Sequence, residues 1–175
     1  MKTALLVIDV QRGLFALNPP PYEANAVVDR INRLAARARR AGAPVVFIQH
    51  ERATLAFQSE GWQLVETLAV EAGDILIRKT TPDSFLRTEL GETLADLGIE
   101  RVVVCGFASE FCVDTTTRRA AALGYEVTLA ADAHTTQDKA HMDAAAIRAH
   151  ENATLSSIVS FGPKISAVTC ADITF

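Results

Sequence analysis

The sequence has few cysteines and no long apolar segment, and both shortages limit what the protein can be. Its 175 residues include three cysteines, which cannot all pair with one another, so we expect reduced thiols rather than a disulfide framework. The apolar runs, such as Ala4–Ile8, are far shorter than the roughly 20 residues of a membrane-spanning helix. Asp9 also ends the first run too early for a secretory signal peptide. We therefore expect a cytoplasmic protein with no membrane partner.

The sequence also lacks an excess of positive charge, a linker and a phosphate-binding loop. Lysine and arginine number 17 against 21 aspartate and glutamate residues, and a mildly acidic chain without a basic block is a poor nucleic-acid binder. No glycine-rich nucleotide motif follows any apolar run, so no cofactor is expected. No repeat or glycine–serine linker divides the chain. At roughly 150 residues per domain, we expect residues 1–175 to form one domain. A domain of this size buries about two thirds of its unfolded surface, which is enough for a core without disulfides.

Short apolar runs that alternate with longer helical segments make up most of the sequence. Runs that are apolar on both faces are typical of parallel strands covered on both sides. The predicted strands are Ala4–Ile8, Pro44–Ile48, Asp74–Ile77, Arg101–Cys105 and Glu126–Ala130, with a weaker sixth near Thr154–Val159. Apolar residues at helical spacing and glycines at helix ends predict helices over Tyr22–Ala41, Ser84–Leu97, Glu110–Leu123 and Met142–Ala149.

This alternation predicts an α/β fold of three layers. An open, Rossmann-like, mainly parallel sheet of six strands would lie between helices on its two faces, because crossover connections are right-handed. In such sheets a ligand binds beyond the carboxyl ends of the strands, at the point where the winding reverses. The residues that directly follow the predicted strands are therefore the first candidates for a functional site.

Three chemically useful side chains follow three of the predicted strands. Asp9 ends the first strand, within VIDVQ, and Lys79 ends the third, within IRKTTPDSF. Cys112 follows the fourth strand, in the first turn of a helix for which Ser109 is the predicted N-cap. The positive end of that helix would lower the pKa of the Cys112 thiol.

Each of these residues also has a plainer interpretation: a capping carboxylate, a solvated lysine and a buried structural thiol. Together, however, the carboxylate can take the thiol proton while the ammonium stabilises both anions, as in an activated nucleophile. Cys105 lies within an apolar strand and is interpreted as structural. The scheme needs no histidine, and none of the four pairs obviously with Cys112: His50, His134, His141 and His150.

These motifs resemble those of the isochorismatase-like cysteine hydrolase superfamily. The strings VIDVQ, KTTPDSF and CGFASEFCVDTTTRRAAALGYEVTLAADAHTT follow in the same order at similar spacing. The superfamily includes nicotinamidases, N-carbamoylsarcosine amidases and true isochorismatases. The resemblance implies a catalytic triad of Asp9, Lys79 and Cys112. It also implies a cis peptide between Phe107 and Ala108, and an oxyanion hole formed by the backbone N–H groups of Ala108 and Cys112.

Two branches of the superfamily fit the sequence less well. Metal-dependent nicotinamidases carry an Asp-x-His string after the second strand, whereas here IQHERATLAF supplies only His50. Asp132 and His134 have that spacing but follow the fifth strand, so we interpret them as loop or rim residues and expect no metal. True isochorismatases cleave a vinyl ether and do not need a nucleophilic cysteine. The presence of Cys112 favours hydrolysis of a C–N bond through a thioester.

The long connection His50–Leu68 has no predicted strand and contains the only tryptophan. Such connections are often functional lids or oligomer contacts. Phe15, Gln49, His50 and Trp62 are the candidates for the wall of the substrate pocket, and they suggest a small amide, ureido or lactam-like substrate. The resemblance further implies a homo-oligomer, a dimer or a tetramer.

Other functions remain open at the level of the sequence. Asp9 acting as an acid would also suit vinyl-ether hydrolysis. A reactive Cys112 would suit a redox-sensitive thiol protein, although no resolving cysteine lies nearby in the sequence. An inactive binding protein is a third reading, which the intact set of three residues disfavours. Glu110 replaces the Asp or Asn often found two residues before the cysteine of the superfamily, and its effect is not predicted.

Overall fold

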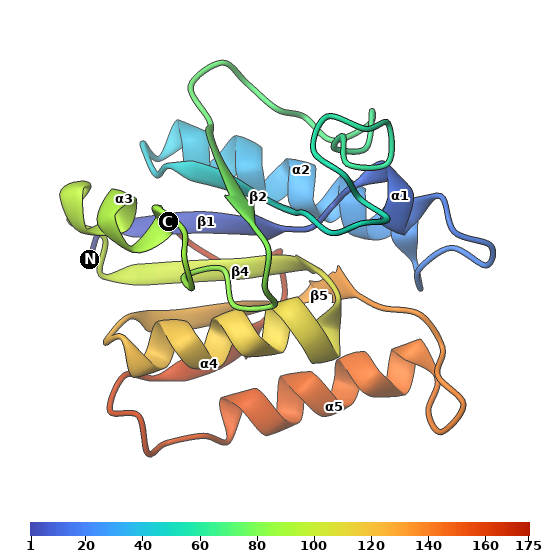
Figure 1. Ribbon diagram of the computed structural model, residues 1–175. Helices are drawn as coiled ribbons and strands as arrows, with labels where there is room; N and C mark the ends of the chain where they lie inside the picture. The colour runs from blue at the N-terminus through green and yellow to red at the C-terminus, as the bar shows by residue number, and fades with distance from the viewer.

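Six strands form one sheet, in the order β3-β2-β1-β4-β5-β6. In this computed structural model, which describes residues 1–175, helices cover both faces of the sheet (Figure 1). All neighbouring strands run parallel, which confirms the predicted three-layer α/β fold. The strands are β1 (Thr3–Ile8), β2 (Val45–His50), β3 (Ile75–Lys79), β4 (Arg101–Phe107), β5 (Glu126–Thr135) and β6 (Ile165–Val168).

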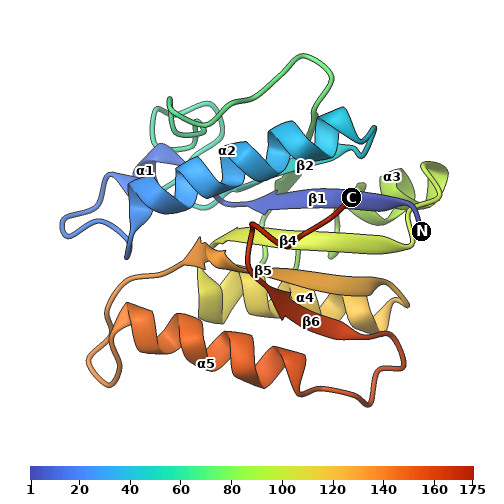
Figure 2. The same cartoon turned by 180° about the vertical axis from the view of Figure 1, so that it is seen from behind.

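The helices divide between the two faces of the sheet. They are α1 (Arg12–Phe15), α2 (Ala24–Arg40), α3 (Leu90–Asp96), the π-helical turn η1 (Ser109–Val113), α4 (Asp114–Ala122) and α5 (Ala144–Ser156). Buried apolar residues of α2 belong to one core cluster, and buried apolar residues from α3, α4 and α5 belong to the other. In Figure 2, α2 lies in front of the sheet and α4 behind it. This division follows from right-handed crossovers, because the winding reverses direction between β1 and β4. None of the helices combines the length and the apolar character needed to cross a membrane.

The central strand β1 shows why the apolar runs do not alternate. All six of its residues are buried. Leu6 and Ile8 pack in the cluster that includes α3, α4 and α5, whereas Leu5 and Val7 pack in the cluster that includes α2. A strand covered on both faces places every side chain in a core, so its sequence is continuously apolar.

The prediction of a sixth strand near Thr154–Val159 is wrong. Helix α5 continues to Ser156, and the last strand is Ile165–Val168. Leu155 is fully buried on the last turn of α5 and packs in the core beneath it. Leu155 therefore serves helix packing, whereas Val159 lies beyond the helix and is 85% exposed. A short apolar run does not distinguish the end of a buried helix from a strand.

The two central strands approach each other closely at the point where the winding reverses. Gly106, near the end of β4, has a φ of 116°, and a Cβ atom there would lie 2.1 Å from the Ile8 carbonyl oxygen. Only glycine fits both this conformation and this contact. The same edge of the sheet carries Asp9 directly after β1, so the close approach brings the ends of β1 and β4 together.

The connection between β2 and β3 contains neither helix nor strand, as the sequence predicts. It lies over α1 (Figure 1) and is held there by three backbone hydrogen bonds. The N–H groups of Arg12 and Gly13 donate to the carbonyls of Gln63 and Gly61, and the Val65 N–H donates to Val10, at 2.8, 2.9 and 3.1 Å. The connection is therefore a fixed part of the sheet edge where the candidate residues lie.

Candidate active site

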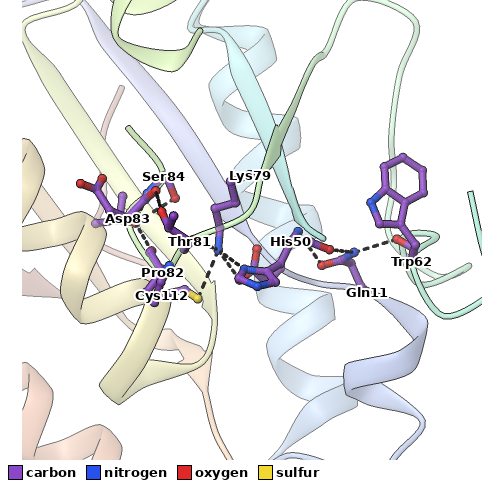
Figure 3. Close-up of polar contacts among 11 residues, drawn as sticks. Gln11, His50, Trp62, Lys79, Thr81, Pro82, Asp83, Ser84 and Cys112 are labelled. Carbon is purple, nitrogen blue, oxygen red and sulfur yellow. Dashed lines mark hydrogen bonds and ion pairs between the residues drawn. The ribbon is translucent and has the colours of Figure 1, made fainter. Parts of the chain in front are cut away.

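The ammonium of Lys79 lies at the centre of a buried polar cluster at the carboxyl ends of the strands (Figure 3). Its Nζ is 2.8 Å from Asp9 Oδ2, 2.9 Å from His50 Nδ1, 3.1 Å from the Thr81 carbonyl oxygen and 3.2 Å from Cys112 Sγ. The side chains of Lys79 and Asp9 are 0% and 2% exposed. A buried charge needs a partner, and these two residues form an ion pair.

Four possible acceptors surround an ammonium that has three N–H donors. The weakest acceptor among them is the Cys112 sulfur, because a thiol is a poor acceptor. The other carboxylate oxygen of Asp9, Oδ1, is buried and has no hydrogen-bond partner. A carboxylate oxygen of Asp9 lies within 4.8 Å of Cys112 Sγ. Asp9 thus retains an unused acceptor beside a group that carries a proton.

The Cys112 thiol is protonated in the resting state. Burial raises its pKa to about 12, with a further increase from the Asp9 carboxylate, whereas the Lys79 ammonium acts in the opposite direction. The prediction that the helix end lowers this pKa is therefore wrong, because burial outweighs the helix. A base must take the proton before the sulfur can act as a nucleophile.

Ser109 also differs from its predicted role. The residue at the N-cap of η1 is Ala108, and no side chain caps the turn. The Ser109 hydroxyl lies 2.8 Å from His134 Nδ1, and His134 Nε2 lies 3.0 Å from Asn152 Oδ1. Because the Asn152 amide nitrogen donates to the Ala131 carbonyl, its Oδ1 accepts the Nε2 proton of His134. Nδ1 then accepts from Ser109, and the network connects η1 to α5.

Asp132 and His134 both lie in β5, and their interpretation as loop or rim residues is wrong. His134 is fully buried, and burial lowers its pKa to about 4, so it is neutral near pH 7. Asp132 Oδ1 accepts the Cys170 N–H at 2.7 Å, and Oδ2 lies 3.6 Å from Arg30 Nε. The two side chains thus engage separate partners, Asp132 near α2 and His134 near η1 and α5. Residues two apart in a regular strand share a face, and here the register of β5 against β4 shifts between Leu129 and His134, which interrupts that regularity.

His50 is neutral for a related reason. Burial lowers the pKa of its imidazole, and the neighbouring Lys79 ammonium lowers it further. Since an ammonium can only donate, His50 Nδ1 is the acceptor and Nε2 carries the ring proton. The side chain is 16% exposed, so His50 lies at the border between the buried cluster and solvent.

The peptide bond between Phe107 and Ala108 is cis. Ala108 is buried, and its N–H donates to no acceptor in the protein. The Ala108 carbonyl accepts the N–H groups of Phe111 and Val113 at 3.0 and 3.1 Å, which draws η1 tightly around this peptide. An unused N–H group thus lies at the start of the turn that carries Cys112.

Gln49 is buried and hydrogen-bonded within the protein. It is 3% exposed, and its amide nitrogen donates to the Trp62 carbonyl at 3.0 Å. The fully buried Gln11, which sequence reasoning missed, donates to the carbonyls of Trp62 and His50 and accepts the His50 N–H. The sequence signal for a role of Gln11 was its position two residues after Asp9, at the end of an apolar run. The two amides fix the connection between β2 and β3 against the sheet edge, and the contacts of Gln11 are drawn in Figure 3.

The two aromatic candidates for the pocket wall lie differently. The Trp62 ring packs edge-on against Phe57 at 5.0 Å and points away from Cys112 (Figure 3). The Phe15 ring packs edge-on against Phe107, with ring centroids 5.9 Å apart. Phe15 is therefore next to the residue that begins the cis peptide, whereas Trp62 belongs to the packing of the long connection.

A second set of side chains surrounds η1 and was not predicted. Phe111, directly before Cys112, is 54% exposed, and Lys139 Nζ lies 5.5 Å above its ring. Glu110 Oε1 lies 3.1 Å from Lys139 Nζ and accepts the Thr136 hydroxyl at 2.9 Å. Glu110 thus fastens the segment after β5 to the turn that carries the thiol.

The family model described as the isochorismatase domain matches residues 3–158. The chain belongs to the isochorismatase family. An isochorismatase-family crystal structure, that of an isochorismatase from Pseudomonas putida KT2440, has a TM-score of 0.89 at 31% identity and covers 98% of this chain and 89% of that one. The resemblance read from the three motifs is confirmed.

Two curated relatives in this family carry specific names. Streptothricin hydrolase of Streptomyces noursei is 44% identical over 140 residues, covering 77% of this chain and 50% of that protein. Ureidoacrylate amidohydrolase RutB of Pseudomonas syringae is 28% identical over 171 residues, covering 75% of this chain and 70% of that protein. The chain spans about half the length of the streptothricin hydrolases that it matches.

Proposed function

We propose that this protein is a cysteine hydrolase that cleaves the C–N bond of an amide or ureido group in a small molecule, through a thioester on Cys112. The observation that carries the proposal is the position of one ammonium, Lys79 Nζ, within hydrogen-bond distance of both Asp9 and Cys112. The names of the streptothricin hydrolase and the ureidoacrylate amidohydrolase among the relatives support C–N hydrolysis.

In the first step, the Cys112 thiol gives its proton to Asp9, and the thiolate attacks the carbonyl carbon of the substrate. The cluster with a carboxylate, an ammonium and a thiol has no net charge. After the proton has moved, the cluster holds a carboxylic acid, an ammonium and a thiolate, and its net charge is again zero. Since a buried site tolerates net charge poorly, a proton transfer between neighbours that leaves the total unchanged is the least costly route to the nucleophile.

The attack moves an electron pair onto the carbonyl oxygen. The N–H groups of Ala108 and Cys112 are proposed to bind this oxyanion, and the free N–H of Ala108 supports that role. Asp9 then passes its proton to the leaving nitrogen, the C–N bond breaks, and the acyl group remains on the sulfur. Throughout this step the Lys79 ammonium holds Asp9 in place by their hydrogen bond.

Water completes the reaction at the thioester. Asp9, again a carboxylate, takes a proton from the water molecule, and the water oxygen attacks the thioester carbon. The tetrahedral intermediate collapses with loss of the thiolate, which recovers its proton from Asp9, and the carboxylic or carbamic acid leaves. His50 Nε2–H, at the border of the cluster, is the donor proposed to bind a polar acceptor of the substrate, which favours amide and ureido compounds.

The test is ammonia or amine release from a panel of small amides, ureido compounds and lactams. The wild-type protein should hydrolyse at least one compound, and Cys112→Ala should lower kcat/KM by about 1000-fold or more. Hydroxylamine added during turnover should trap the acyl group of the thioester as a hydroxamate. Retention of the wild-type rate by Cys112→Ala, with loss of activity in Asp9→Asn, would instead indicate direct attack by water on the amide without a covalent step.

A further inference from the structure

Three zinc-ligand atoms converge on the point that the Lys79 ammonium occupies. A carboxylate oxygen of Asp9, a ring nitrogen of His50 and the sulfur of Cys112 lie within 4.8 Å of one another. Oxygen, imidazole nitrogen and thiolate sulfur are the protein ligands of Zn²⁺. We propose that Asp9, His50 and Cys112 form a latent Zn²⁺ site, which the ammonium of Lys79 keeps closed by occupying the position of the ion.

The ligand atoms already face this position. Lys79 Nζ is 2.8 Å from Asp9 Oδ2, 2.9 Å from His50 Nδ1 and 3.2 Å from Cys112 Sγ. Because His50 Nδ1 accepts from the ammonium, its lone pair points at the place where a metal ion would lie. Each ligand atom would have to approach a bound Zn²⁺ by less than about 1 Å to reach ordinary coordination distances. Shifts of that size are within the range of side-chain motion.

A carboxylate oxygen of Asp9 that accepts no hydrogen bond offers the metal ion a further ligand atom. The Asp9 side chain is 98% buried, and its Oδ1 atom has no hydrogen-bond partner. A buried carboxylate oxygen without a partner is costly. No hydrogen bond holds Oδ1, so a metal ion between the three ligands could bind either oxygen of Asp9.

Charge balance explains how Zn²⁺ and the ammonium exclude each other. With Lys79 charged and Cys112 protonated, the Asp9 carboxylate is the only negative charge and the cluster is neutral. With Zn²⁺ bound, the thiol loses its proton, and the two anionic ligands neutralise the ion. Zn²⁺ therefore replaces one ammonium and one thiol proton, and in the wild-type protein Lys79 must leave the centre or lose its own proton. Removal of Lys79 abolishes that requirement and leaves an unpaired buried carboxylate, which attracts a cation.

A zinc ion at this position would be an inhibitor. It would bind the proposed nucleophile and the proposed base at once, so neither could take part in hydrolysis. Lys79 thus protects the thiol from thiophilic metals in addition to its proposed catalytic role. The binding of Zn²⁺ is inferred from the positions of the ligands alone, whereas its inhibitory effect rests on the proposed function.

The test is isothermal titration of metal-free Lys79→Met with ZnCl₂, with wild type in parallel. Methionine keeps the length of the side chain without its charge. The variant should bind one Zn²⁺ per chain at least about 100-fold more tightly than wild type, since a charge repulsion at close range is removed. Bound Zn²⁺ should also slow alkylation of Cys112 by iodoacetamide. MgCl₂ should not bind, because Mg²⁺ requires oxygen ligands.

Second-site variants show which residues hold the ion. Adding His50→Gln or Cys112→Ser to Lys79→Met should abolish the tight binding, whereas adding His141→Gln, at an exposed position, should leave it unchanged. If Lys79→Met does not fold without metal, Lys79→Gln offers an amide donor to Asp9 and is titrated instead. Binding no tighter than wild type in the variant that folds, or tight binding that survives loss of His50 and of Cys112, would overturn the proposal while leaving the hydrolase proposal intact.

Discussion

Lys79 and Asp9 form an ion pair across the carboxyl end of the sheet, from the edge strand β3 to the central strand β1. Their N–O distance is 2.8 Å, and neither side chain is more than 2% exposed. Strand β2 lies between the two, so the Lys79 side chain reaches across the end of that strand, where it also contacts His50. A charge pair so deeply buried ties the position of the candidate base to that of the lysine.

Breaking this pair should destabilise the fold. Lys79→Met and Asp9→Asn should each lower the free energy of unfolding by about 3–5 kcal/mol, because the remaining charge stays buried without a partner. The double variant should cost less than the sum of the two, since it removes both charges. Urea unfolding of all four proteins, with EDTA present, measures these differences. Losses below about 1 kcal/mol for both single variants would mean that the pair is open to water.

Gly106 should be among the least replaceable residues near the site. Gly106→Ala places a Cβ atom 2.1 Å from the backbone oxygen of Ile8 at a φ of 116°, so we expect a loss of about 3 kcal/mol or more, or failure to fold. Gly124→Ala is the matched control: its φ of 98° is also positive, but no atom lies within 4 Å of the new Cβ. The control should cost only about 1 kcal/mol. Equal melting temperatures for the two variants would contradict the close approach of β1 and β4.

His134 should make the fold sensitive to acid. Burial lowers its folded-state pKa to about 4, below the ordinary value of 6.5. Between these two values the unfolded chain binds a proton at His134 that the folded chain does not bind. The contribution of neutral His134 to the free energy of unfolding is therefore complete above pH 6.5 and is lost as the pH falls towards 4. The loss is of the order of 3 kcal/mol. Urea midpoints measured across this range should fall less steeply in His134→Gln than in wild type, and parallel curves would show that His134 is not the group responsible.

The candidate catalytic residues were predictable because parallel strands end at one edge of the sheet. Asp9 and Lys79 end apolar runs, and Cys112 follows a third, so their meeting required only the fold class. The order of the strands was not predictable from the runs, because it depends on which crossovers reverse direction. The wrong strand at Thr154–Val159 arose because the apolar content of a buried helix end and that of a strand look alike.

Features that depend on burial or on the path of a loop were beyond the sequence. The thiol of Cys112 lies at a helix start, which favours a thiolate, but the depth of its burial decides the pKa and is a property of the whole fold. Gln49 and Trp62 were reasonable pocket residues by position. Their roles instead follow from the backbone path of the connection after β2, which Gln11 fixes through three hydrogen bonds.

The coupling of Cys112 to Asp9 and Lys79 is tested most directly by the pH dependence of iodoacetamide alkylation, read by mass spectrometry with EDTA present. Cys105, fully buried with a raised pKa, serves as the internal control. Since burial and Asp9 raise the pKa of Cys112 and Lys79 lowers it, wild type should titrate well above the free-thiol value of about 8.5. Asp9→Asn should shift the profile to lower pH, and Lys79→Met should shift it to higher pH. Coincident profiles for the three proteins would contradict a coupled nucleophile and base.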